Sequence, residues 1–155
     1  MLIKPADQTK TIMISPTLGV AEFNESSKYL FNSYTHDYIV SEKLADYVFS
    51  KNIKKIALIG AEDVWVKEQT NAFRNSYEKL GGKIVFITEP IPGSRELRTE
   101  ALNIKTHIKD IDGIVSTTDG VIIGSLIAKI LKELNVKVPM YSISLDQASI
   151  DASEG

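Results

Sequence analysis

The stretch Lys55-Ile56-Ala57-Leu58-Ile59-Gly60 decides the fold, because it is a continuous apolar run of strand length that stops at a glycine. Such a run is typical of a parallel strand covered on both faces. Further apolar runs follow at residues 83–88, 113–117 and 138–143, and helical patterns alternate with them from residue 39 onward. This alternation predicts an α/β fold in which helices cover both faces of a doubly wound, mostly parallel sheet.

The regions between and before these strands have patterns of their own. Residues 97–108 carry apolar side chains at spacings of four, three and four, which indicates an amphipathic helix, and Ser94 is placed to cap it. The pair Gly81-Gly82 is placed to end the preceding helix, because glycine accepts the left-handed conformation of a helix C-terminus. The first 36 residues predict two short strands, at 11–15 and 28–34, and no long helix.

Composition excludes several classes of function. With 155 residues, 43% of them hydrophobic and 25% charged, we expect one soluble domain with a substantial core. The net charge of -2 gives no electrostatic support for a nucleic-acid partner or for binding to an anionic membrane. The absence of cysteine excludes disulfides, thiolate metal sites and cysteine nucleophiles. Residues 1–7 lack the apolar segment of a signal peptide.

Catalytic and cofactor motifs are missing from the sequence. The turn after Gly60 has one glycine and two acids, Glu62 and Asp63, whereas a phosphate-binding loop needs several bare amides and no neighbouring anions. His36 and His107 lack the spacing of a metal-binding pair, and no G-x-S-x-G motif is present. We therefore expect no catalytic residues, no cofactor and no metal, and we expect Glu62 and Asp63 to be solvated loop acids.

Candidate ligand contacts follow the predicted strands, because ligands of open α/β sheets lie outside the carboxyl ends of the strands. Trp65 offers a flat apolar face and one N–H donor, or alternatively anchors the adjoining helix in the core. Asp119, beside Thr117 and Thr118, could neutralise a ligand ammonium or cap the next helix. Asp146, after the fourth strand, has the same two interpretations.

Five blocks of sequence, in order, resemble a known family. They are a loop before the main strands, a crossing strand, the first core strand with its following helix, a proline-glycine loop, and the approach to the third core strand, at residues 14–17, 29–33, 54–85, 91–98 and 108–115. In this order they resemble the type I periplasmic binding proteins, and most closely the leucine/isoleucine/valine-binding branch. The resemblance covers nearly the whole chain.

The resemblance implies a protein whose two lobes close on a ligand, which is then delivered to the membrane permease of an ABC transporter. It assigns residues 1–36 to the end of the first lobe and the hinge strand. It assigns residues 37–155 to the second α/β lobe, incomplete at its C-terminus. The full-length parent would then be periplasmic or otherwise extracytoplasmic.

The family's binding residues can be carried over position by position. Ser15 and Thr17, with Gly19 nearby, correspond to the first-lobe site for a ligand carboxylate. Trp65 corresponds to an aromatic residue of the pocket, although Val66 follows it where the family has glycine. The expected ligand-binding set, in which the ammonium-binding acid falls on Ser144 or two residues later, is Ser15, Thr17, Trp65, Asp119, Ser144 and Asp146.

The sequence thus predicts the non-catalytic ligand-binding lobe of a transporter's substrate-binding protein, with an amino acid or similar small solute as ligand. The alternative is the small-molecule sensing domain of a receptor or transcriptional regulator, which shares the fold. A transmembrane segment or a DNA-binding helix-turn-helix would favour that alternative, and neither is present in this sequence. An enzyme is the third hypothesis, and it would require a nucleotide-binding loop. We also expect self-association, because the strand around Tyr29–Tyr34 would expose an open edge.

Overall fold

The main sheet consists of four parallel strands in the order β4-β3-β5-β6. The computed structural model describes residues 3–118 and 120–153. Each predicted core run contains one of these strands, namely β3 (Lys55–Ile59), β4 (Lys83–Thr88), β5 (Gly113–Ser116) and β6 (Met140–Ser142). All three pairings in this sheet are parallel, which confirms the predicted sheet.

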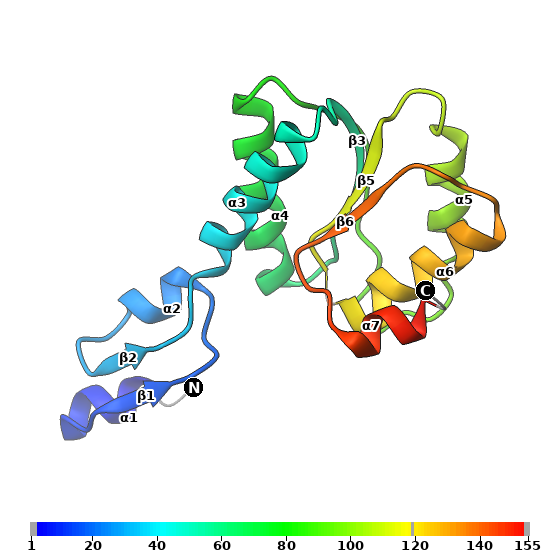
Figure 1. Ribbon diagram of the computed structural model, residues 1–155. Coiled ribbons are helices and arrows are strands. Elements are labelled where there is room, and N and C mark those ends of the chain that lie inside the picture. Colours follow the sequence, from blue (N-terminus) through cyan, green and yellow to red (C-terminus); the bar gives the residue numbers. More distant parts are fainter. Residues whose placement is uncertain (1–2, 119, 154–155) are drawn as a thin grey trace.

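Helices cover both faces of the main sheet (Figure 1). On one face, α3 (Asp37–Ser50) and α4 (Val64–Lys79) pack against Ile56 and Leu58 of β3. On the other, α5 (Arg98–Thr106) and α6 (Ser125–Glu133) pack against Ala57 and Ile59. Because consecutive residues of β3 point to opposite faces, one continuous apolar strand serves both cores. The doubly wound α/β layer is therefore as predicted.

Local chemistry explains how α4 and α5 begin and end. Asp63 caps α4, accepting hydrogen bonds from the backbone N–H groups of Trp65 (2.8 Å) and Val66 (3.2 Å), so the expectation of a solvated loop acid is wrong for it. Gly81 follows α4 with a φ of 93°, as its glycine predicts. The expectation that Ser94 caps α5 is wrong, because the helix begins at Arg98 and the Ser94 amide instead closes a turn to the Ile91 carbonyl.

The N-terminal region forms a smaller sheet. The strands β1 (Met13–Ser15) and β2 (Leu30–Asn32) pair in parallel, with α2 (Ala21–Glu25) between them and α1 (Ile3–Thr9) before them. Both strands were predicted and both helices were not, since helices of seven and five residues show almost no periodicity. Figure 1 shows this N-terminal sheet apart from the main sheet, with the chain passing from β2 into α3.

The last described element is α7 (Gln147–Ala152), a short helix after β6. A further helical segment, η1 (Gly120–Gly124), runs directly into α6. Within the described ranges, no helix combines the length and the apolar character needed to cross a membrane.

Candidate functional site

A cavity of about 260 Å³ opens at the carboxyl ends of the main-sheet strands. We call it the strand-end cavity. Its walls come from the segment before α3, from α3 and α4, and from the residues that follow β5 and β6. The lining residues are Tyr34, Val40, Trp65, Val66, Gln69, Thr118, Ile143 and Ser144.

The topology of the sheet accounts for this position. Strand β3 has β4 on one side and β5 on the other, so the connections leaving β3 and β4 lead to helices on opposite faces. In open α/β sheets, ligands bind in the crevice at such a switch point. Thr118 follows β5 and Ser144 follows β6, while Trp65 lies in the first turn of the helix after β3. The strand-end cavity therefore lies where the fold class places a ligand.

Buried hydroxyl groups neighbour two of the lining residues, Gln69 and Thr118, in the chain. The Thr70 and Thr117 hydroxyls lie 2.7 Å apart, and Thr117 also donates to the Ile59 carbonyl at 3.3 Å. The Ser116 and Thr118 hydroxyls are 3.0 Å apart. Because buried hydroxyls are costly unless paired, these bonds hold α4 and the end of β5 in one arrangement.

Trp65 is half-exposed, with 49% of its surface accessible, and its ring lines the strand-end cavity. Its indole N–H donates a hydrogen bond to the carboxylate of Asp37, the first residue of α3. Asp37 itself is only 4% exposed. Of the two interpretations drawn from the sequence, the structure disfavours a core anchor for Trp65.

The polar character of the cavity comes from neutral groups. Hydroxyl groups of Tyr34, Thr118 and Ser144 and the amide of Gln69 are combined with the Trp65 ring, and no lining residue named above carries a formal charge. Such a wall can stack on a flat or apolar group and accept or donate hydrogen bonds.

Gln69 and Tyr34 were not among the expected site residues. Gln69 lies four residues after Trp65 on α4, so helical spacing from Trp65 could have identified it. Tyr34 was assigned to a strand, whereas β2 ends at Asn32 and Tyr34 belongs to the segment that leads into α3.

Of the predicted first-lobe residues, Ser15 is the last residue of β1 and Thr17 lies on the loop that follows, and neither of them lines the strand-end cavity. The Thr17 amide donates to the Ser15 hydroxyl at 3.5 Å. Gly19, further along this loop, is packed against Asp37: its carbonyl accepts from the Asp37 amide at 3.0 Å. The structure thus brings this loop to the start of α3.

The remaining expected residues differ in their placement. Asp119 lies outside the described residues. Ser144 lines the strand-end cavity, whereas Asp146 does not line it and caps α7. Hydrogen bonds from Ser149 to Asp146, 2.6 Å from the hydroxyl and 2.8 Å from the amide, hold the pKa of the Asp146 carboxyl below its ordinary value.

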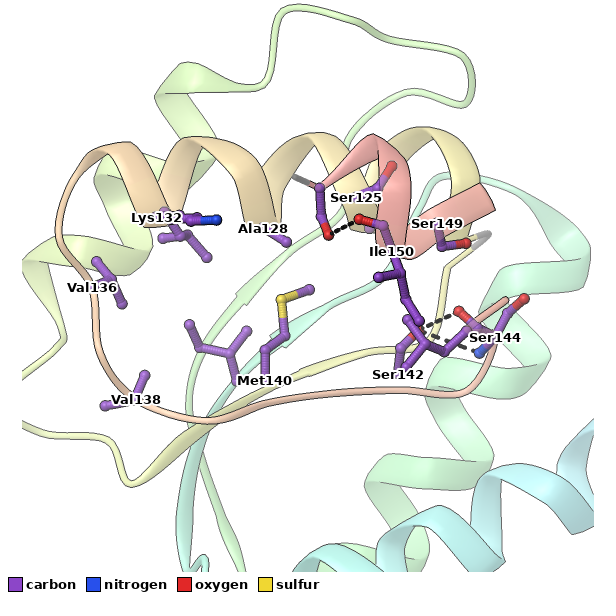
Figure 2. A pocket seen from close by; sticks show the side chains of 15 residues that line it. Ser125, Ala128, Lys132, Val136, Val138, Met140, Ser142, Ser144, Ser149 and Ile150 are labelled. Carbon is purple, nitrogen blue, oxygen red and sulfur yellow. Dashed lines mark hydrogen bonds between the residues drawn. The ribbon is translucent and has the colours of Figure 1, made fainter. Parts of the chain in front are cut away.

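A second, larger cavity of about 500 Å³ lies along β6, between α6 and α7. We call it the β6 groove. Figure 2 shows aliphatic side chains along most of it, with Val136 and Val138 at one end, Met140 near the middle, and Ser142, Ser144 and Ser149 at the other end. Because it runs along the flank of β6 and its walls are mainly aliphatic, we do not assign the solute site to it.

The two histidines have packing partners. His36 stacks on Tyr38, with ring centroids 5.7 Å apart, and His107 stacks on Phe86 at 4.8 Å. Among the residues with described positions, no group of three or more histidines and acids is arranged to hold a metal ion.

Comparisons with solved structures identify the fold. The leucine-binding protein LivK of Thermotoga maritima superposes with a TM-score of 0.86 at 15% identity, over 97% of this chain and 43% of LivK. The branched-chain amino acid binding protein LivJ of Streptococcus pneumoniae, solved with isoleucine, gives 0.83 at 21% identity, over 97% and 43%. A solute-binding protein of R. palustris, solved with 4-hydroxybenzoate, gives 0.80 at 16% identity, over 91% and 39%.

The chain thus spans less than half the length of these solved structures. A comparison with curated protein sequences finds no match. The family profile described as periplasmic binding protein matches residues 2–155. On this match, the chain belongs to the periplasmic binding protein family.

Proposed function

We propose that this chain supplies one wall of a non-catalytic binding site for a small organic acid, with an amino acid as the first candidate. The observation that carries the proposal is the strand-end cavity, whose aromatic and neutral polar walls lie at the switch point of the sheet. Its volume of about 260 Å³ suits a solute of amino-acid size. The structural neighbours support this class, since one was solved with isoleucine and another with 4-hydroxybenzoate.

In this proposal the ligand is divided between two walls. The ligand's side chain or ring lies against Trp65 and Tyr34, and its carboxylate is bound by Ser15 and Thr17. Gln69, Thr118 and Ser144 supply hydrogen bonds on the second-lobe side. An ammonium group would be neutralised by Asp119, because Asp146 is engaged in capping α7.

The protein that contains this wall would act outside the cytoplasm and deliver its solute to the permease of an ABC transporter. A complete site would also need the parts of the fold that LivK has and this chain does not span. A micromolar solute corresponds to about -8 kcal/mol, so a wall with half the contacts retains about -4 kcal/mol, a dissociation constant near millimolar. We therefore expect weak binding by this chain alone.

The experiment uses Trp65, the only tryptophan, as reporter. Its fluorescence is followed while L-leucine, benzoate or glucose is added to about ten millimolar, a tenfold excess over a millimolar site that also stabilises the fold by about 1.4 kcal/mol. We expect saturation with one of the two acids and none with glucose. Leucine and benzoate distinguish an amino acid site from an aromatic acid site.

A matched pair of variants locates the site. Gln69→Ala should weaken binding by about fivefold or more, because it removes hydrogen-bonding groups from the cavity wall. Gln147→Ala, on the exposed surface of α7, should leave binding unchanged. Micromolar binding by this chain alone would contradict the divided site. Equal effects of the two variants would contradict its location.

A further inference from the structure

The carboxylate of Asp37 joins two parts of the molecule that are distant in sequence. On one side it accepts the hydrogen bond from the Trp65 indole N–H, 28 residues away. On the other side it lies against Gly19, so closely that a Cβ atom added there would be 1.9 Å from Asp37 Oδ2. The Asp37 amide donates to the Gly19 carbonyl at 3.0 Å. Asp37 therefore contacts both the wall of the strand-end cavity and the loop after β1, which carries Thr17 and Gly19.

The position of Asp37 suits a carboxylate that must stay in place. It is the first residue of α3, where the exposed amides of the helix N-terminus favour a negative charge. It is almost completely buried, so its oxygen atoms cannot exchange the indole for bulk water without opening the structure.

A second contact joins α4, the helix that carries Trp65, to the segment at residues 19–21. Glu68 lies one turn after Trp65 on α4, and its Oε1 accepts a long hydrogen bond of 3.4 Å from the Ala21 amide. The beginning of α4 is thus tied to the Gly19–Ala21 segment through Asp37 and through Glu68. The orientation of the Trp65 ring and the position of the loop are consequently linked.

We infer that Asp37 is a positioning residue: its carboxylate fixes the Trp65 ring in the wall of the strand-end cavity and couples that wall to the loop after β1. The inference deepens the proposed function and rests on it for its effect on ligand binding. The orientation of Trp65 itself can be tested without ligand. A fixed ring is useful in a binding site because the cost of ordering it is met during folding and not on binding.

The test compares Asp37→Ala with Asp37→Asn in the ligand-free chain. Asparagine keeps an oxygen acceptor of the same size for the indole N–H, and alanine removes it. A single tryptophan gives a single indole N–H resonance, and we expect Asp37→Asn to retain its slow hydrogen exchange. In Asp37→Ala that exchange should accelerate by about tenfold or more, the factor that follows from losing one hydrogen bond to a charged group. Acrylamide quenching of the fluorescence should rise in parallel.

Two further variants serve as controls for the comparison of Asp37→Ala with Asp37→Asn. Asp46→Asn removes an exposed carboxylate from the same helix and should leave the indole signal unchanged. Gly19→Ala keeps both hydrogen-bonding partners but displaces the carboxylate, so it should shift the indole resonance even if Asp37→Ala does not fold. An indole signal that is identical in all variants would overturn the inference. Equal disturbance by Asp37→Asn and Asp37→Ala would also overturn it, since the acceptor oxygen would then be irrelevant.

Binding of leucine or benzoate is measured in the same variants. We expect Asp37→Ala to weaken binding by about tenfold and Asp37→Asn to restore it to within about threefold of the unmodified chain. If the unmodified chain binds neither acid, the proposed function fails, while the indole exchange still decides whether Asp37 positions Trp65. If Asp37→Ala releases the indole but binds as tightly as the unmodified chain, the coupling to the site is refuted.

Discussion

The main sheet and the N-terminal sheet are both parallel, but only the main sheet is covered on both faces. In the main sheet, β5 is buried along its whole length and β3 is buried after its first residue. In the N-terminal sheet, Ile14 and Phe31 are paired in register and are 73% and 54% exposed. Parallel strands are normally buried on both faces. The comparison indicates that the main sheet contains its own core, whereas the N-terminal sheet has an apolar face that this chain leaves open.

The largest effect expected from this difference is on stability. Ile59→Ala removes a fully buried side chain from β3 and should lower the free energy of unfolding by about 2–5 kcal/mol. The same change at Ile14 should cost less than about 1 kcal/mol, because little buried surface is lost there. Urea denaturation of the two variants and the unmodified chain measures both values.

Milder substitutions cover the case in which Ile59→Ala does not fold. Ile59→Val should cost about 0.5–1.5 kcal/mol, and Ile14→Val should have almost no effect. Equal losses of stability at positions 14 and 59 would show that both sheets contribute to one shared core, and that the main sheet does not contain a core of its own.

The next largest effect is the pH dependence of stability, and it concerns the core of the main sheet alone. Tyr77 is fully buried on α4 and donates to the Ile53 carbonyl at 2.9 Å. Burial, with a contribution from the Asp112 carboxylate, raises the pKa of the Tyr77 phenol to about 12. In the unfolded chain the phenol ionises near pH 10. The stabilisation linked to the neutral phenol is therefore complete below pH 10 and is lost as the pH rises from about 10 to about 12.

Tyr77→Phe tests this pH dependence. At pH 9 the variant should be less stable by about 1–2 kcal/mol, because the Ile53 carbonyl loses its partner. As the pH rises to 11, the difference in free energy of unfolding should narrow, because only the unmodified chain loses the stabilisation that is linked to the neutral Tyr77 phenol. Urea denaturation at both pH values gives the two differences, and Tyr34→Phe in the exposed segment is the control. A difference that widens with pH would contradict the assignment.

The same contrast explains how much of the fold the sequence predicts. Burial on both faces leaves a continuous apolar run, and for this reason the strands from β3 to β6 were recognisable, as was the buried face of the helix at residues 97–108 from its spacing. In the N-terminal region the two strands were also predicted, whereas α1 and α2 were missed because they are too short to show a period. The cap of α5 was wrongly placed at Ser94: the N-cap position is occupied by Leu97, three residues later, so the helix begins at Arg98.

For the candidate site, position relative to strand ends was sufficient for Trp65 and Ser144, which both line the strand-end cavity. It was insufficient for Asp37, because the contact between Asp37 and Trp65 joins two helices and no local pattern encodes it. Position after a strand also selected Asp146 as a candidate ligand contact. In the structure this carboxylate is instead engaged in capping α7. Residues whose roles depend on tertiary contacts are the ones that sequence reasoning did not find.

The smallest effect expected is self-association through the N-terminal sheet. Among the described residues, β1 and β2 pair only with each other, so the outer edge of each strand faces no other strand. Open edges next to exposed apolar side chains favour pairing between copies. We expect the weight-average mass from light scattering to rise above the monomer value only at the highest protein concentrations.

The double substitution Ile14→Lys and Phe31→Lys should return the mass to that of the monomer, because charged side chains on an edge strand oppose pairing. Leu102→Lys, on the partly exposed surface of α5, is the matched control and should associate like the unmodified chain. The free energy of unfolding should change little in all of these variants, since the substituted side chains are exposed. A chain that stays monomeric at every concentration would show that the apolar face formed by Ile14 and Phe31 does not mediate contacts between copies. A mass lowered equally by Leu102→Lys would indicate that added charge, and not the loss of the apolar face, prevents association.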